Sequence, residues 1–265
     1  MSARKDLLQS IGEPPLRGDR NRSLERGIEI LRAFRPGSDL LGNGELAERT
    51  GLSRATVSRL TQTLVDAGML EHDRRRRAYR LAAPVLSLAH AMRSGSPILQ
   101  VAGPLMRNEA EHRKINVGLA IADRDEMVYL ESVRYSRRVA WRNVVAGQRV
   151  PMELTSLGRA WLAAATDEQR RALMDLFQSR RESGWRQLAR DITAAIVSVH
   201  RMGYCWATWQ PQVVALATPV ILAGHPVYVL NMSVTGDAEP ADVVERLSGP
   251  LLALARHIRE SVSQQ

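Results

Sequence analysis

Apolar positions in the first third of the chain follow a helical period. A helix that starts at Ser23 and ends before Pro36 would collect apolar side chains on one face, at spacings of three and four residues. The residues of this face are Leu24, Ile28, Leu31 and Phe34. Ser23 carries the hydroxyl group that is preferred at a helix N-cap, so we expect it to cap this helix.

Two further helices follow in the same region. A short helix is expected over 45–50 and a longer one over 53–67, and Gly51 lies in the turn between them. The longer helix should bury a stripe that consists of Val57, Leu60 and Leu64.

A basic hairpin is expected after these helices. Residues 69–71 and 79–81 form two short strands, and the loop between them carries four consecutive arginines, Arg74 to Arg77. The order helix, helix, turn, helix, hairpin is that of a winged helix-turn-helix, which predicts such a domain over 23–83. The segment 1–22 has no apolar period and is expected to be a flexible arm.

The rest of the chain mixes helices with strands. A linker helix is expected within 84–97, before a larger domain over 98–265. Helices of this domain are expected over 99–114, 155–165, 167–177, 185–202 and 241–261. Strands are expected over 116–122, 127–133, 138–146, 204–209, 213–222 and 227–234. Strands and helices are segregated and form no βαβ repeat, so the fold class is α+β with an antiparallel sheet.

Length and composition agree with two folded domains. The chain has 265 residues, of which 45% are hydrophobic and 25% are charged, as in ordinary globular proteins. Cys205 is the single cysteine, and no histidine pair has metal-ligand spacing, so we expect no disulfide, metal site or cofactor. Neither a long apolar run nor a secretory signal is found, which favours a cytoplasmic protein without a membrane partner.

The charge of the chain points to a polyanion. Lysine and arginine number 37 against 28 acidic residues, a formal net charge of +9, and only Lys5 and Lys114 are lysines. Residues 1–83 hold 16 basic and 11 acidic side chains, so the positive excess is densest at the front of the chain. Nucleic acid is therefore the expected partner of this region, although solubility alone could explain the overall charge.

Three small or branched residues support the helix-turn-helix. Ala47 is small where two helices would cross, Gly51 permits a tight turn, and Val57 would fill the space between the helices. The second helix of such a motif lies in the major groove of DNA. We therefore predict that this chain binds double-stranded DNA.

Individual DNA contacts follow from this geometry. Arg59 is expected to read a guanine edge, and Ser53 and Thr56 suit phosphate contacts at the helix N-terminus. The full predicted set on this helix is Ser53, Arg54, Ala55, Thr56, Ser58 and Arg59. Arg74, Arg75, Arg76 and Arg77 suit a minor groove or its flanking phosphates. The alternative for Arg54 and for the four-arginine tip is a charge that is simply solvated.

Motifs in both halves of the chain resemble the IclR family of bacterial transcriptional regulators, from about Ser23 to Ser261. In the N-terminal domain the matching motifs are the segments 23–27 and 79–81 and the helix-turn-helix. In the larger domain they are Gly-Gln-Arg-Val-Pro at 147–151, Thr-Ser-Leu-Gly-Arg-Ala at 155–160, Arg-Met-Gly-Tyr at 201–204 and Ala-Thr-Pro-Val at 217–220. The resemblance implies a homodimer, often a dimer of dimers, whose C-terminal domain is a GAF-like sensor with a small-molecule pocket.

The resemblance also carries a set of pocket positions onto this chain. They are Trp141, Asn143, Leu154, Ser156, Trp206, Trp209, Ala215, Asn231 and Ser233. Three of them are tryptophans, and flat indole faces favour a small organic acid as effector, with aromatic acids among the candidates. The alternative is that the tryptophans only pack the core. Arg142 and Arg149 are basic residues near this pocket, but Arg142 should face away from it by strand alternation.

Two other functions are alternatives to a ligand-responsive regulator. One is a constitutive DNA-binding protein without a ligand, and the other is an enzyme domain fused to a DNA-binding head. The chain has no Gly-x-Ser-x-Gly elbow, no Walker loop and no Gly-x-Gly-x-x-Gly after a strand, so an enzyme is not expected. The operator sequence, the effector, the direction of regulation and the choice between dimer and tetramer do not follow from the sequence.

Overall fold

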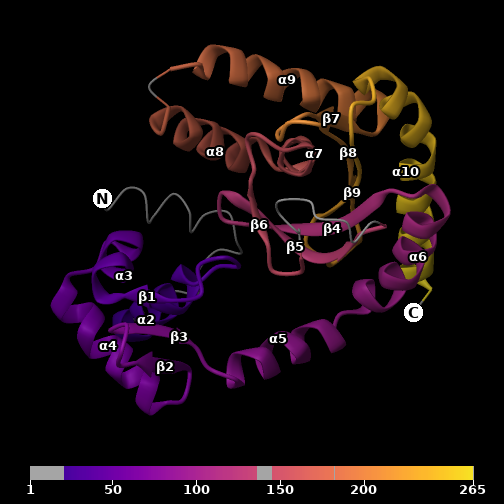
Figure 1. Cartoon of the computed structure of the whole chain (residues 1–265). Helices are drawn as coiled ribbons and strands as arrows, with labels where there is room; N and C mark the ends of the chain where they lie inside the picture. Colours follow the sequence, from indigo (N-terminus) through magenta and orange to yellow (C-terminus); the bar gives the residue numbers. More distant parts are fainter. Residues whose placement is uncertain (1–20, 136–144, 182, 265) are drawn as a thin grey trace. The chain divides into compact units, whose positions relative to one another are not determined.

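The computed structural model describes residues 21–135, 145–181 and 183–264, and these form two compact units that divide between Ser96 and Pro97. The first unit contains three helices, a small sheet and a further helix (Figure 1). Their bounds are α2 (Arg22–Ala33), β1 (Leu41–Gly42), α3 (Asn43–Thr50), α4 (Arg54–Asp66), β2 (Leu70–Asp73), β3 (Ala78–Leu81) and α5 (Pro84–Ser94).

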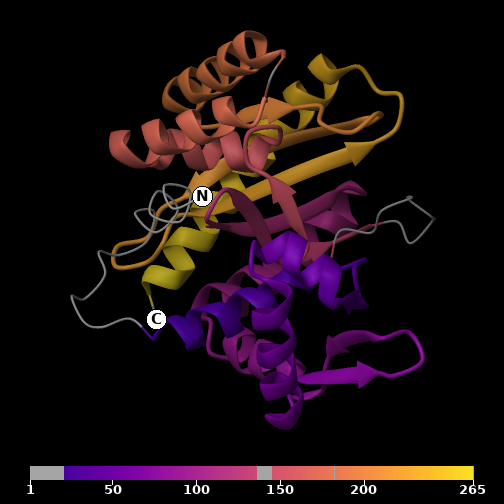
Figure 2. The same ribbon diagram turned by 90° about the vertical axis from the view of Figure 1, so that its left-hand side faces the viewer.

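The first unit is a winged helix-turn-helix, as predicted. Its sheet has the antiparallel order β1-β3-β2, and β2 and β3 form the hairpin, drawn in purple, that projects from the helices of this unit in Figure 2. The three helices pack around fully buried apolar residues, which are Ile30, Leu41, Leu46, Val57 and Leu70. In α4, Val57 is buried as expected, whereas Leu60 and Leu64 are only partly buried.

The start and the buried face of α2 differ from the prediction. Asn21, and not Ser23, caps the helix, because its Oδ1 accepts the N–H groups of Ser23 and Leu24 at 3.1 Å. Of the predicted apolar face, Phe34 is buried and Leu31 packs partly buried against the core, whereas Leu24 and Ile28 are exposed. The helix also buries Ile30 and Ala33, which the prediction did not include. Spacing identifies an apolar stripe but does not tell whether the chain's own core covers it.

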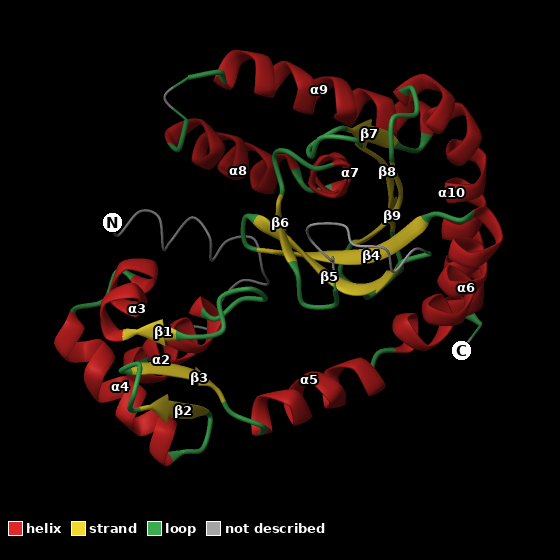
Figure 3. Cartoon of the chain, viewed as in Figure 1, coloured by secondary structure: helices red, strands yellow, loops and turns green. Residues whose placement is uncertain are grey.

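The described strands of the second unit form one antiparallel sheet of six, in the order β6-β5-β4-β9-β8-β7 (Figure 3). Their bounds are β4 (Asn116–Asp123), β5 (Glu126–Val133), β6 (Arg149–Pro151), β7 (Cys205–Ala207), β8 (Val213–Val220) and β9 (Tyr228–Thr235). The helices are α6 (Pro97–Arg113), α7 (Ser156–Ala164), α8 (Asp167–Ser179), α9 (Trp185–Met202) and α10 (Pro240–Ser263). This arrangement confirms the α+β class.

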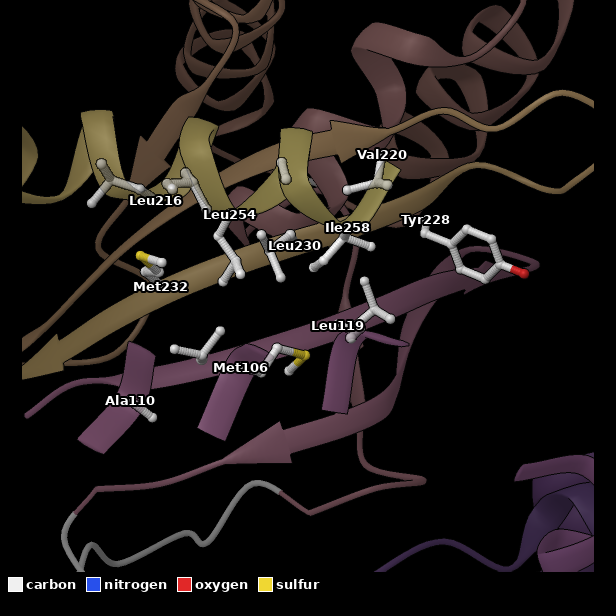
Figure 4. Close-up of a cluster of buried hydrophobic side chains, with 14 of the residues drawn as sticks. Met106, Ala110, Leu119, Leu216, Val220, Tyr228, Leu230, Met232, Leu254 and Ile258 are labelled. Atoms are coloured by element: carbon white, nitrogen blue, oxygen red, sulfur yellow. The ribbon is translucent and has the colours of Figure 1, made fainter. Parts of the chain in front are cut away.

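Helices cover both faces of this sheet. Against one face, α6 and α10 pack on alternate strand residues such as Leu119, Leu216 and Met232, which form a buried apolar cluster (Figure 4). On the other face α7 lies against the sheet, and α8 and α9 join α7 in a second buried apolar cluster. Because side chains alternate along a strand, the neighbours Gly118 and Ala217 face this second layer.

The strand expected over 138–146 falls largely on residues 136–144, which lie outside the described part of the chain. Val145 to Gly147 are described and do not belong to a strand. The sheet is instead extended by β6, whose Val150 pairs with Met127 of β5. Three residues are too few to show a period in the sequence. No helix in the described residues is long and apolar enough to span a membrane.

Candidate DNA interface and effector site

Local hydrogen bonds fix the turn before α4. Gly51 adopts φ 69°, a left-handed conformation that favours glycine, and its N–H donates to Ala47 O at 2.9 Å. Ser53 caps α4, because its Oγ accepts the N–H of Thr56 at 3.3 Å and lies 3.0 Å from the Thr56 hydroxyl. The turn and the cap together set the direction in which α4 leaves α3.

The outer face of α4 carries the predicted DNA contacts. Val57 points into the core, while the side of the helix away from it is open to solvent. Ser53, Arg54, Ala55, Ser58 and Arg59 are exposed and Thr56 is half-buried. The guanidinium of Arg54 lies near Gly44 of α3, where an added Cβ would be 4.0 Å from it. Cations and hydroxyl groups are thus presented along one helix face.

The tip of the β2–β3 hairpin presents all four predicted arginines. Asp73 Oδ1 accepts the backbone N–H groups of Arg75 at 3.0 Å and Arg76 at 3.1 Å, which orders the turn without using their side chains. Arg77 adopts φ 49° and closes the loop before Ala78. Arg74 to Arg77 are exposed, and the structure shows no ion pair for them within the described residues.

Two other arginines of this unit make internal contacts. Arg49 donates to Ala33 O at 3.0 Å and to Ser38 Oγ at 3.3 Å, so it ties α3 to the end of α2. Arg80 pairs with Glu71 at 3.3 Å across the hairpin. The sequence does not separate these two arginines, which have partners within the unit, from Arg59 and Arg74 to Arg77, and only the structure does.

A row of small and polar residues crosses the sheet of the second unit beneath α7. The register places Cys205, Ala217, Asn231 and Gly118 side by side on β7, β8, β9 and β4. The next row on the same face holds Ala207, Ala215 and Ser233. The register therefore brings together three of the predicted pocket residues, which are Ala215, Asn231 and Ser233.

Further predicted residues border the same face. Ser156 is the first residue of α7, and its carbonyl oxygen lies 3.5 Å from Cys205 Sγ. Leu154 and Trp209 are partly buried and pack against the apolar cluster between the sheet and α7 to α9. Burial raises the pKa of Cys205 to about 12, so this thiol stays protonated and unreactive at neutral pH.

Trp206 does not belong with these residues. It pairs with Leu216, whose side chain enters the cluster under α6 and α10, so Trp206 lies on the opposite face of the sheet and is 43% exposed. Alternation along β7 separates it from Cys205 and Ala207. Trp141 and Asn143 lie outside the described residues.

Arg149 is held by acidic side chains. It forms ion pairs with Glu126 at 2.8 Å and with Asp123 at the β4–β5 turn. Burial lowers its pKa, but the hydrogen bonds and charges of these two carboxylates outweigh this effect and raise it. In the described part of the chain, no group of three or more His, Cys, Asp or Glu side chains is placed to hold a metal ion.

Sequence reasoning missed three residues of the α7-facing side, which are Gly118, Tyr129 and Arg134. A Cβ at Gly118 would lie 2.5 Å from both Asn231 Oδ1 and Tyr129 Cε1, so these two side chains converge directly above the glycine. Asn231 Oδ1 and Arg134 Nε are buried and have no hydrogen-bond partner. Burial raises the pKa of Tyr129 to about 12, and a hydrogen bond with Asn231 and the charge of Arg134 lower it less.

Comparisons with known proteins cover most of the chain. The family model of the IclR helix-turn-helix domain matches residues 23–74, and that of the bacterial transcriptional regulator IclR C-terminal domain matches residues 90–260. The HTH-type transcriptional regulator TsaQ1/TsaQ2 of Comamonas testosteroni is 31% identical over 234 residues, which cover 87% of this chain and 84% of that protein.

Solved structures of IclR-family proteins are also similar to this chain. An IclR family transcriptional regulator from Brucella abortus has a TM-score of 0.82 at 33% identity, covering 92% of this chain and 93% of its own. An IclR homolog from Microbacterium hydrocarbonoxydans, complexed with 4-hydroxybenzoate, has a TM-score of 0.69 at 20% identity. This second match covers 92% of this chain and all of the other, and it is a likeness of fold.

Proposed function

The chain belongs to the IclR family of bacterial transcriptional regulators, and we propose that it binds an operator through α4 and the β2–β3 hairpin under the control of a small organic acid. The family consists of DNA-binding transcriptional regulators and not of enzymes. This membership removes the possibility that the second unit is a catalytic domain. What remains to be argued is which residues touch DNA and which hold the effector.

The exposed face of α4 carries the DNA-binding proposal. Arg59 is exposed on this helix and forms no ion pair within the described residues, so its guanidinium is available for the two acceptors of a guanine edge. Ser53, Arg54 and Thr56 lie at the helix N-terminus, where hydroxyl groups and the helix dipole suit phosphate oxygens. Ala55 and Ser58 complete the surface that would lie in the major groove.

The first experiment tests Arg59 as a reader of sequence. A duplex selected from random DNA for tight binding is compared with a scrambled duplex of the same composition. Arg59→Ala should weaken binding to the selected duplex by about 5- to 150-fold, because one bidentate guanine contact discriminates by about 1–3 kcal/mol. Binding to the scrambled duplex should change much less, since non-specific affinity comes from phosphates. Fluorescence anisotropy measures both affinities at one salt concentration.

Arg107→Ala is the matched control for this measurement. Arg107 is an exposed arginine on α6, in the other unit, and its loss should leave both affinities unchanged. Equal losses on the two duplexes for Arg59→Ala would show that Arg59 contacts only the backbone of DNA.

The effector part of the proposal rests on the α7-facing side of the sheet. Asn231 keeps a buried acceptor without a partner there, in a row with small residues of the neighbouring strands. We include Leu154, Ser156, Trp209, Ala215, Asn231 and Ser233, and we leave out Trp206 because it faces the other side. Trp141 and Asn143 stay in the proposal on the family resemblance alone. The 4-hydroxybenzoate held by the homolog supports an aromatic acid as the class of ligand.

A thermal-shift screen of aromatic and aliphatic acids on the full chain tests this part. A ligand at about 100 times its dissociation constant stabilises the folded state by roughly 2.7 kcal/mol, which gives a readable shift. A hit should also change the affinity for the selected duplex, because an effector acts through unequal affinity for two states. A screen without any hit would favour a constitutive DNA-binding protein.

A further inference from the structure

Buried polar atoms without partners gather on one part of the second unit. Asn231 is 5% exposed, and its Oδ1 accepts no hydrogen bond. Arg134, just after β5, has a buried Nε that donates none. Most buried polar atoms in proteins are paired, and an unpaired one costs stability, so each of these two atoms is a candidate for a hydrogen bond with a bound molecule.

These groups lie on the same face of the sheet. Asn231 is opposite Gly118, and Gly118 is opposite Ser132 on β5. Arg134 follows the last residue of β5 and is two residues after Ser132, so continued alternation puts it on the face of Ser132. The charge of Arg134 lowers the pKa of Tyr129, as expected of a cation on the same face of the sheet. Asn231, Tyr129 and Arg134 thus surround one area of the sheet.

Gly118 makes this arrangement possible. Glycine weakens a strand interior, and it is used where another group must approach the backbone closely. Any side chain at this position would collide with the Asn231 amide and the Tyr129 ring, since its Cβ would lie 2.5 Å from each. The backbone therefore forms the floor on which the amide and the phenol lie.

The three polar groups differ in what they accept and donate. Asn231 Oδ1 needs a donor, and the Arg134 guanidinium prefers an anion, above all a carboxylate. The Tyr129 hydroxyl lies against the Asn231 side chain and fixes the amide in place, so Tyr129 is a positioning residue. A ligand that pairs with both Asn231 Oδ1 and the Arg134 guanidinium must carry a hydrogen-bond donor and a carboxylate.

We propose that Asn231 and Arg134, positioned by Tyr129 above Gly118, select a hydroxylated carboxylic acid whose carboxylate pairs with Arg134 and whose hydroxyl donates to Asn231 Oδ1. The proposal rests on the proposed function, because it names the chemistry of the effector at that site. It adds two selecting contacts that the family resemblance did not assign, and it gives each a separate test.

Isothermal titration of the full chain with three probes tests the proposal. The probes are 4-hydroxybenzoate, benzoate, which lacks the hydroxyl, and 4-hydroxybenzyl alcohol, which lacks the carboxylate. The wild-type chain should bind 4-hydroxybenzoate at least about tenfold more tightly than either of the others, because each loses one hydrogen bond to a buried group. A site that was merely apolar would show no such double preference.

Variants assign each preference to a residue. Asn231→Leu should remove the preference for the hydroxyl but keep that for the carboxylate, and Arg134→Gln should do the reverse. Tyr129→Phe should weaken the hydroxyl preference only. Tyr228→Phe is the control, because Tyr228 is a β9 tyrosine in the cluster under α6 and α10, and it should bind all three probes as the wild type does.

The outcomes separate this proposal from the function it rests on. If both preferences persist in Asn231→Leu and Arg134→Gln, these residues do not select the ligand. The same conclusion holds if the variants weaken the binding of all probes equally. In both cases the proposed effector site itself is not refuted. If none of the three probes binds the wild-type chain, the hydroxylated class is wrong. The effector function itself fails only if the wider acid screen also finds no ligand.

Discussion

At the scale of single residues, the unpaired Oδ1 of Asn231 should lower the stability of the protein when no ligand is bound. Its Oδ1 is buried and unpaired, so replacing the amide by an apolar side chain of similar volume removes a desolvation penalty. The same change also removes the hydrogen bond between Asn231 and Tyr129, so Asn231→Leu should change the free energy of unfolding by less than about 1 kcal/mol. Thermal denaturation without ligand checks this, and about 1 kcal/mol corresponds to roughly 2–4 °C in a domain of this size.

Thr218→Val is the matched control for this measurement. Thr218 is also buried in the same sheet, but its hydroxyl donates to Gly203 O at 2.7 Å. Its replacement should therefore lower stability by about 1 kcal/mol. Should Asn231→Leu destabilise the chain as much as Thr218→Val does, Asn231 is an ordinary structural residue.

Individual residues also show how much of the proposed effector site the sequence could indicate. Ala215, Asn231 and Ser233 came from the family resemblance, and the strand register brings them together. Trp206 was misplaced because its side of the sheet depends on the pairing of β7 with β8, which the sequence does not show. Tyr129 and Arg134 were missed because β5 carries an irregularity opposite Leu119 and Ala120, which shifts the faces of its residues.

At the scale of elements, the hairpin tip should set the salt dependence of DNA binding. Arg75 and Arg76 expose their side chains, while Asp73 holds their backbone N–H groups, so the turn survives replacement of either side chain. Arg75→Gln with Arg76→Gln should weaken specific and non-specific binding together. If each contacts one phosphate, the slope of log affinity against log salt should flatten by about 1.8 in total.

Anisotropy titrations at several salt concentrations give this slope. Arg80→Gln is the control within the same hairpin, because Arg80 is paired with Glu71 and should contribute little. An unchanged slope in the double variant would mean that the tip stays in solvent when DNA is bound.

The helices and most strands were predicted, and two of the shortest strands were missed. The capping box at Thr166 and Gln169 starts α8 as expected, with N–H to side-chain oxygen distances of 3.2 Å in both directions. The two-residue β1 and the three-residue β6 were missed, because pairing with a neighbour and not an internal pattern makes them strands. Only part of the predicted face of α2 is buried, because Leu31 and Phe34 contact the core while Leu24 and Ile28 stay exposed.

At the scale of the whole molecule, exposed apolar residues on two helices of the first unit support the proposed homodimer. Leu24 is 63% exposed and Ile28 45% exposed on α2, four residues apart. On α5, which buries no residue, Leu88 and Met92 are likewise four residues apart, and their exposures are 60% and 53%. Monomeric proteins rarely leave such stripes in water, so a second copy of the chain is the partner that we propose for them.

The mass of the chain in solution tests this proposal, because a homodimer or dimer of dimers must exceed the 29.5 kDa of one chain at least twofold. Leu88→Glu with Met92→Glu places two charges on the α5 stripe and should weaken this association and, with it, binding to a two-site operator. Leu86→Glu is the control, because Leu86 is 75% exposed but lies on another side of α5. Light scattering after size exclusion measures the mass. A monomeric wild-type chain would refute the homodimer, whereas a dimer that survives the double variant would be held together by other surfaces.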